Sequence, residues 1–352
     1  MEKALPNFDS LMAPLQSHID TLQKHFDAHT LLEILTAQQW LVMASGRPIP
    51  KMLFSEFWFE GEFCMLFADT NLGKSILAVQ LADSISKGAA IPGFHLQAAP
   101  QRVLYVDFEL SDKQFEARYS DNFKDHYAFS EEFLRAELTR APVGSEAAGQ
   151  FETLLHNALE KAVVEHEARV LIIDNITYLS CETERAQHAL PLMKQLKSLQ
   201  RKYDLSILTL AHTPKRDLTR PLTRNDLQGS KMLINFCDSA FAIGESQQER
   251  RVRYLKQIKA RNVELKYDSD QVCVCQIAKP GNFLQFQWHG FGAEFEHLRQ
   301  QNEEERASKG QEIAALKATG LSNVAIAKKM NLTEGTVRYW LKSSTRSCKQ
   351  CT

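Results

Sequence analysis

Short apolar runs alternate with longer amphipathic stretches through the middle of the chain. The runs at 63–67, 103–108, 170–173, 206–210 and 240–243 predict buried strands. Between these runs apolar residues recur at spacings of three and four, which predicts helices at 75–86, 112–122, 149–166 and 186–202. Strands that alternate with helices predict an α/β fold with a mostly parallel sheet and flanking crossover helices.

The pattern changes on both sides of this region. Apolar residues at mixed spacings of three and four from 15 to 44 predict one or two helices. Gly46, Pro48 and Pro50 predict the end of this helical part. Apolar runs at 251–259, 271–277 and 283–288 predict a smaller antiparallel extension, and the charged stretch at 296–306 predicts a connector. We therefore expect three parts, which are an N-terminal helical segment at 1–58, the α/β domain at 59–295 and a C-terminal helical unit at 306–352.

The C-terminal unit has the spacing of three short helices, at 312–319, 322–330 and 333–342. Ser322 and Thr333 stand at predicted N-caps, and the predicted core is formed by Ile326, Leu332, Val337 and Leu341. This layout is similar to the winged or resolvase-like helix-turn-helix units of bacterial DNA-binding proteins. The residues that the last helix would present to duplex DNA are Thr333, Thr336, Arg338, Tyr339 and Lys342. Such a unit can also dock a protein, and that alternative stays open.

Composition adds a charge asymmetry to this picture. The 352 residues are 44% hydrophobic and 24% charged, which is typical of a globular chain of two or three domains. The formal net charge is only −1, so affinity for nucleic acid must come from local clusters. From Arg306 to the end there are nine basic residues against two acidic ones, which favours DNA as the partner of this unit.

The cysteines and the hydropathy indicate the compartment. The seven cysteines are scattered apart from two close pairs, and Cys348 and Cys351 have no second pair at zinc-like spacing. No signal peptide and no apolar run of roughly 20 residues is present. We expect a cytoplasmic protein that does not interact with a membrane.

A phosphate-binding loop follows the first predicted strand. A triphosphate needs backbone amides around it, a Lys to neutralise its terminal phosphates and a hydroxyl to hold Mg²⁺. The segment between strand and helix supplies all three, and its predicted nucleotide-binding residues are Ala68, Asp69, Thr70, Asn71, Leu72, Gly73, Lys74 and Ser75. It departs from the Walker A pattern at its first position, where Ala68 replaces Gly. The sequence predicts ATP and Mg²⁺ as the ligands, with Ser75 on the metal.

Carboxylates end two further predicted strands. Asp174 follows the apolar run at 170–173 and is predicted as the second metal-site residue. Asp107 and Glu109 stand at the end of the run at 103–108, where either could orient the water that attacks the phosphate. Strand alternation places both on the same side, so spacing alone does not choose between them.

Together these motifs resemble the RecA-like ATPases, in the branch that contains DnaB-type replicative helicases and RepA-type hexameric helicases of plasmids. The DnaB-type loop also often has Ala at its first position. The resemblance covers roughly residues 60 to 265, and the further segments that match in the same order are 108–111, 172–174, 208–212, 220–230 and 259–262.

The resemblance implies roles for single residues. Glu109 would be the catalytic carboxylate, Lys74 would act on the terminal phosphates, and His212 would sense the terminal phosphate. Lys259 and Arg261 would reach the ATP of a neighbouring subunit, which implies a homo-oligomer, with a hexamer favoured. The alternative for His212 is a structural histidine that is hydrogen-bonded at a strand end. The alternative for Lys259 and Arg261 is a basic strand that faces solvent.

The resemblance also implies contact with DNA in the channel of a ring. The stretch at 213–231 is basic and poor in apolar residues, and its predicted contacts with single-stranded DNA are Lys215, Arg216, Arg220 and Arg224. A solvated loop without a partner is the alternative.

The sequence therefore predicts an ATP-hydrolysing, DNA-binding motor, similar to the helicases of plasmids or other mobile elements. The rival hypothesis is a DNA-bound regulator or recruitment platform whose ATP state controls assembly without separating strands. A small-molecule kinase is disfavoured, because nothing in the sequence supplies a lid that binds an acceptor.

Overall fold

The computed structural model describes residues 32–138, 147–176, 186–214, 216–227, 231–300 and 303–330, together with Leu332, Glu334, Val337, Arg338 and Leu341. Residues 1–49 and 50–352 form two compact units. In the first unit, helix α2 (Ala37–Ser45) begins after Thr36, whose side chain forms a capping box with Gln39. Residues 32–36, which the prediction also made helical, are not helical, and the part of the prediction at 15–31 lies outside the described residues.

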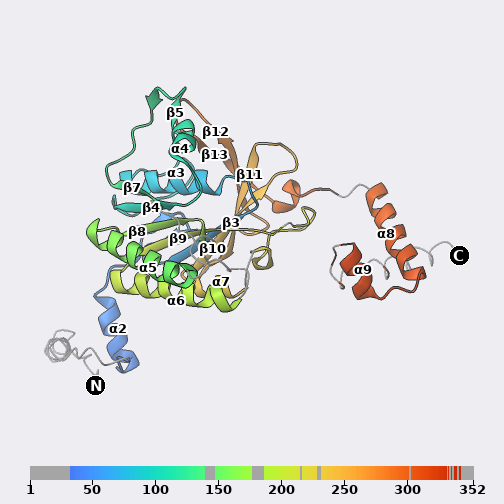
Figure 1. The fold of residues 1–352 in the computed structure, drawn as a ribbon, viewed down its shortest axis with the longest axis horizontal. Coiled ribbons are helices and arrows are strands. Elements are labelled where there is room, and N and C mark those ends of the chain that lie inside the picture. Colours follow the sequence, from blue (N-terminus) through green and yellow to red (C-terminus); the bar gives the residue numbers. More distant parts are fainter. Residues whose placement is uncertain are drawn as a thin grey trace, which may run out of the picture. The chain divides into compact units, whose positions relative to one another are not determined.

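A nine-stranded sheet organises the second unit, in the order β13-β12-β11-β10-β3-β9-β8-β4-β7 (Figure 1). The six strands from β10 to β7 run parallel, and β11, β12 and β13 extend the sheet as antiparallel strands. The strand bounds are β3 Phe63–Ala68, β4 Val103–Asp107, β7 Phe133–Glu137, β8 Val170–Asp174, β9 Ser206–His212, β10 Ser239–Glu245, β11 Val252–Lys259, β12 Val272–Ala278 and β13 Gln285–Gly292.

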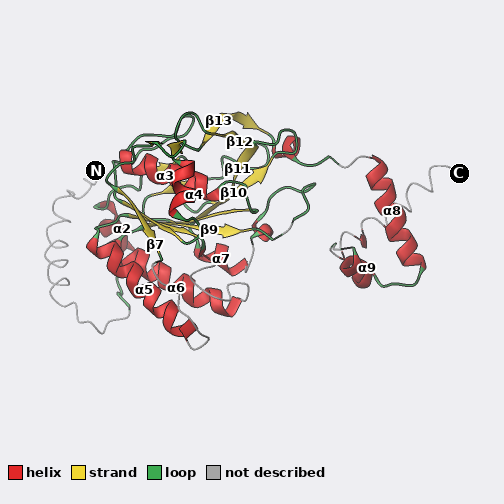
Figure 2. Ribbon diagram, turned by 45° about the horizontal axis from the view of Figure 1, so that its top comes forward, coloured by secondary structure: helices red, strands yellow, loops and turns green. Residues whose placement is uncertain are grey.

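Helices cover both faces of this sheet (Figure 2). They are α3 Lys74–Lys87, α4 Asp112–Arg118, α5 Ala147–Glu165, α6 Ala186–Tyr203 and α7 Lys231–Phe236. The shorter elements are β1 Met52–Phe54, β2 Trp58–Phe59, β5 Ser120–Asp121, β6 Asp125–His126 and the 3-10 turns η2 Arg224–Asp226 and η3 Glu294–His297. In the described part of the chain, no helix is long and apolar enough to cross a membrane.

Strand alternation divides the apolar residues into two cores. Cys64 and Leu66 of β3 point to the core that α3 covers, whereas Phe63, Met65 and Phe67 point to the core under α5, α6 and α7. All six residues of β3 are buried because the strand is covered on both faces. The predicted class of fold, α/β with a mostly parallel sheet and flanking helices, is confirmed.

Some element boundaries differ from the prediction. Strand β7 is absent from the prediction because it is an edge strand with half-buried, partly polar residues. The helix expected at 112–122 ends at Arg118, because the chain turns there into the β5–β6 hairpin. The segment 52–58 belongs to the predicted N-terminal helical part, but its residues Phe54, Phe57 and Trp58 are buried in the core on the α3 side.

A buried ion pair fixes the far end of the loop that follows β9. Lys256 Nζ lies 2.5 Å from Glu294 Oε2, and both side chains are almost fully buried. Glu294 Oε1 accepts a hydrogen bond from Leu222 N at 2.6 Å, and Lys256 Nζ donates to Leu222 O at 2.7 Å. The loop therefore runs between His212, at the end of β9, and an anchor at Leu222.

The C-terminal unit has its own small core. Helix α8 (Glu303–Ala318) begins three residues before the predicted start of the unit, and α9 (Asn323–Lys329) is capped by Ser322 as predicted. Glu334, Val337, Arg338 and Leu341 are helical beyond it. Ile313, Ile326, Ala327 and Val337 are buried together, and Leu332 and Leu341 pack against them, so the four predicted core residues are confirmed as neighbours. The predicted cap Thr333 lies outside the described residues.

Candidate nucleotide site

Four parallel strands bring the predicted chemistry to one edge of the sheet. Ala68 ends β3 and pairs with His212 at the end of β9, while Asp107 at the end of β4 pairs with Asp174 at the end of β8. Because β9 lies between β3 and β8, the phosphate loop and Asp174 stand on strands separated by one other strand. Ligands of open α/β sheets bind outside the carboxyl ends of the strands, where these residues lie.

The loop after β3 depends on backbone conformations that few residues adopt. Asn71 has φ +65° and Gly73 has φ +97°, both in the left-handed region. A Cβ at Gly73 would also lie 2.9 Å from Ile277 Cδ1 and 3.0 Å from the ring of Phe286, so only Gly fits this position. Ala68 is the last residue of the strand and has no positive φ. The departure from the Walker A pattern at Ala68 therefore causes no backbone strain in the loop.

Lys74 is buried at the start of α3 and has three acceptors. Its Nζ donates to Ala68 O at 3.0 Å and Asp69 O at 3.1 Å, and lies 3.1 Å from His212 Nδ1. Burial lowers the pKa of Lys74, and the nearby carboxylates, Asp174 foremost, oppose this shift. An ammonium held in this way stands ready to exchange loop carbonyls for phosphate oxygens.

Asp174 fits the predicted role in a magnesium site. It is fully buried, and burial raises its pKa to about 6, although the hydroxyls of Ser75 and Tyr105 act in the opposite direction. Tyr105 donates to Oδ2 at 2.6 Å, whereas Oδ1 has no hydrogen-bond partner in the described part of the chain. A hard cation would satisfy this orphaned oxygen. Ser75 and Asp174 would hold Mg²⁺, which would neutralise charge on the terminal phosphates.

Glu109 shares the pocket with Lys74. His212 Nε2 lies 3.4 Å from Glu109 Oε1, and Asn175 Nδ2 donates to the same oxygen at 3.0 Å. Since His212 Nδ1 faces the Lys74 ammonium, the tautomer with the proton on Nε2 suits both contacts. The His212 contact lowers the pKa of Glu109 and burial opposes it, so the carboxylate is ionised at neutral pH.

Asp107 has a different set of partners. Its Oδ2 accepts hydrogen bonds from Arg135 Nε at 3.0 Å and Nη2 at 2.9 Å, and its Oδ1 accepts from the backbone N–H groups of Glu109 and Leu110. Strand β4 ends at Asp107, so the alternation that would place Asp107 and Glu109 on one side does not continue. The structure thus separates the two carboxylates, and only Glu109 lines the pocket.

Arg118 is a pocket residue that the sequence reasoning missed. It lines the cavity of about 190 Å³ together with Gly73, Lys74, Ser75, Glu109 and His212. Its Nη1 is buried and has no partner in the described residues. The backbone of Arg118 is fixed by a hydrogen bond, because Leu284 N donates to Arg118 O at 3.2 Å. No sequence signal marked Arg118, because its place depends on the distant hairpin between β12 and β13.

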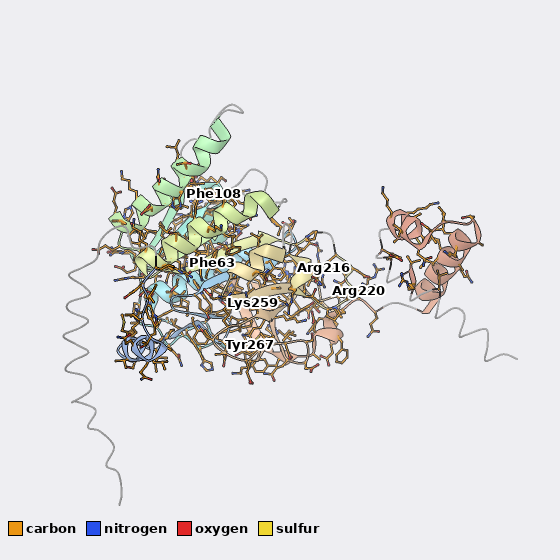
Figure 3. All side chains as sticks on the ribbon, turned by 90° about the horizontal axis from the view of Figure 1, so that it is seen from below. Phe63, Phe108, Arg216, Arg220, Lys259 and Tyr267 are labelled. Atoms are coloured by element: carbon orange, nitrogen blue, oxygen red, sulfur yellow. The ribbon has the colours of Figure 1, made fainter. Side chains whose placement is uncertain are left out.

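Lys259 and Arg261 lie far from this pocket in their own chain. Lys259 Nζ donates to Ile234 O at 2.7 Å, and Arg261 Nη1 lies 3.0 Å from Asp238 Oδ1. Asp238 accepts a hydrogen bond from the backbone N–H of Phe63, the first residue of β3. The phosphate-binding loop follows Ala68, the last residue of β3. The length of this strand, roughly 17 Å, therefore separates Asp238 from the loop. The reader can locate Lys259 and Phe63, the first residue of β3, by their labels in Figure 3. Any contact of these cations with ATP would have to involve another copy of the chain.

The predicted DNA-binding residues are dispersed. Arg216 and Arg220 lie together on the loop after β9 (Figure 3), where Arg216 Nη2 donates to Arg220 O at 3.3 Å. Arg216 is half-buried beside Tyr254, while Arg220 and Arg224 are exposed. Arg338 is exposed and pairs with Glu334 at 2.6 Å. The remaining predicted contacts lie outside the described residues, and they are Lys215, Thr333, Thr336, Tyr339 and Lys342.

A phosphate-binding loop whose lysine shares one pocket with Glu109 and His212, together with a buried aspartate at the end of β8, is the arrangement of a P-loop ATPase site. The sequence matches the AAA domain family over residues 16–217, more than half of the chain, and the protein belongs to this family. It is also similar to the KaiC-like protein PH0186 from the hyperthermophilic archaeon Pyrococcus horikoshii OT3, with a TM-score of 0.41 and 13% identity over 65% of this chain and 91% of that one. No curated protein sequence matched the chain.

We predict that Arg118→Ala weakens nucleotide binding without destabilising the fold. A charge-assisted hydrogen bond contributes about 1.5–3 kcal/mol, so affinity should fall roughly 10- to 100-fold. The buried Nη1 has no partner to lose in the described part of the free protein. Isothermal titration with ADP and ATP measures the effect, and Lys113→Ala on the exposed side of the same helix is the control. Unchanged affinity in Arg118→Ala would exclude contact with the nucleotide.

Asp174→Asn should raise the stability of the nucleotide-free protein at neutral pH. A carboxyl whose folded pKa is about 6 instead of 3.8 binds more protons when folded, so stability falls as pH rises through that window. Asn keeps the shape without the charge, and its advantage should grow by about 1 kcal/mol between pH 5 and pH 7.5. Urea denaturation in a chelator measures this difference. A variant less stable than wild type at pH 7.5 would contradict the role of burial at Asp174.

Proposed function

We propose that this protein hydrolyses ATP with Mg²⁺ at the pocket around Lys74 and uses the energy on DNA, in the manner of RepA- and DnaB-like helicases. One observation carries the catalytic part. Glu109, whose pKa is lowered by His212, faces the same cavity as the buried Lys74. A base that is ionised at neutral pH and placed beside a phosphate-binding lysine is what hydrolysis of a phosphoanhydride requires.

The chemistry assigns one task to each side chain. Glu109 accepts a proton from water as the water oxygen forms a bond to the terminal phosphorus, and the bond from that phosphorus to the bridging oxygen of ADP breaks. Lys74 stabilises the negative charge on the phosphates during this transfer. His212 touches both groups and therefore links the state of the phosphate to strand β9. The products are ADP and phosphate.

Action on DNA is supported by the cations beyond the pocket. Helix α9 ends with Lys328 and Lys329, and Arg338 is exposed in the next helical segment. The loop between His212 and the Leu222 anchor carries Arg220, which is exposed. Since the loop starts at the residue that contacts Lys74, a change at the phosphates would be transmitted directly to it.

A regulator or recruitment platform remains the second candidate, and the separate, compact C-terminal core favours it. Such a unit could hold the protein on duplex DNA while the ATP state controls assembly. Strand displacement on a forked duplex separates the two functions, because only the motor unwinds it.

Lys74→Ala should abolish turnover and Glu109→Gln should strongly slow it, by different routes. Without Lys74 no group in the loop neutralises the terminal phosphates, so ATP affinity should be lost. Glu109→Gln keeps the pocket and should bind ATP but hydrolyse it roughly 100-fold or more slowly. Affinity and steady-state turnover are measured on the same preparations, with exposed Glu249→Gln as the control. Wild-type turnover in Glu109→Gln would remove it as the base.

Removing residues 303–352 should weaken binding to duplex DNA and leave basal ATP turnover unchanged, because no residue of the nucleotide pocket lies in that unit. Each DNA phosphate that the shortened chain no longer neutralises should lower the slope of log affinity against log salt by roughly 0.9. Fluorescence anisotropy across a salt series gives this slope. An identical slope in the shortened chain would mean that the C-terminal unit docks a protein.

A further inference from the structure

A basic groove lies between α6 and α7, away from the nucleotide pocket. Its volume is about 690 Å³, and the cations that line it are Lys194, Lys197, Arg201, Lys202 and Arg261. Helices α6 and α7 lie side by side under the sheet (Figures 1 and 2). The groove was not expected from the sequence, because Arg261 joins it from the end of the β11 hairpin.

The positive charge of the groove is only partly compensated. Lys197 Nζ lies 2.5 Å from Asp238 Oδ2, which belongs to the same carboxylate that Arg261 contacts. Lys202 pairs with Glu160 at 2.6 Å. Lys194 and Arg201 are exposed and have no ion pair in the described residues. Five cations therefore face two carboxylates, and the excess charge has no partner in the described part of the chain.

The spacing of the cations suits a chain of phosphates. Lys194, Lys197 and Arg201 recur at three and four residues on α6, so they share one side of the helix. From Lys194 to Arg201 the helix rises roughly 10 Å, so the three cations form a row that can follow the backbone of a flexible single strand.

The groove also contains groups that could contact nucleobases. Phe236, at the end of α7, lines it and is only partly buried. Asn235 and Ser198 add an amide and a hydroxyl. A cationic groove with an aromatic ring is the combination that binds single strands, since phosphates meet the charges and a base can stack on the ring. A duplex would keep its bases away from the ring.

We propose that this groove binds single-stranded nucleic acid, with Lys194 and Arg201 on the phosphates and Phe236 stacked on a base. The groove would hold a strand on a surface distinct from the loop after β9 and from the C-terminal unit. Nothing in this assignment depends on ATP hydrolysis, so a protein without turnover would still bind through the groove.

The test uses the full chain and a labelled oligothymidine. Lys194→Ala/Arg201→Ala removes two exposed charges, and Lys113→Ala/Lys161→Ala removes two exposed charges elsewhere, on α4 and α5. At about 0.7 per phosphate contact, the groove variant should lower the salt slope by roughly 1.4 relative to the control. Phe236→Leu should weaken binding about five- to a hundredfold at every salt concentration, with the slope unchanged.

Equal slopes for the two double variants would overturn the proposal. The proposal would also be wrong if the groove variant bound the oligonucleotide normally but lost its oligomeric state in native mass measurement, since the groove would then be a contact between copies of the chain. If the protein did not hydrolyse ATP, the proposed function would be wrong. The salt slopes of the two double variants could still be measured, so this proposal would still be tested.

Discussion

The buried ammonium of Lys74 is the constraint around which the site is built. A charge removed from water needs partners, and here the loop carbonyls of Ala68 and Asp69 and the ring of His212 provide them. These partners come from the ends of β3 and β9, so the register of two neighbouring strands determines the site. The left-handed backbone at Gly73 turns the loop so that Lys74 starts the next helix.

Around this centre the remaining charges separate into structural and chemical groups. Asp107 is fully engaged by Arg135 and by two backbone N–H groups, so it holds the turn that carries Glu109. Glu109 instead lines the pocket beside His212, and Asp174 is buried at the end of β8 with one oxygen that is unpaired among the described residues. The arrangement places a glutamate, a buried aspartate and a lysine at the edge where the strands end.

The sequence predicts the parts of this site that local pattern determines. The strands at 63–67 and 170–173 are buried on both faces and therefore read as continuous apolar runs. Strand β7 is only half-buried and was missed, although its Arg135 decides between Asp107 and Glu109. Arg118 and the basic groove depend on contacts between segments far apart in the sequence, such as Leu284 with Arg118, and periodicity carries no signal of them.

The central claim is that the Lys74 pocket takes the triphosphate of ATP together with Mg²⁺. A structure of the protein with Mg²⁺ and a non-hydrolysable ATP analogue tests it most directly. The account predicts that Lys74 Nζ leaves Ala68 O and Asp69 O for phosphate oxygens, with the ion between Ser75 and the orphaned Oδ1 of Asp174. A nucleotide bound while Lys74 keeps its three present acceptors, or an ion held away from Ser75 and Asp174, would contradict it.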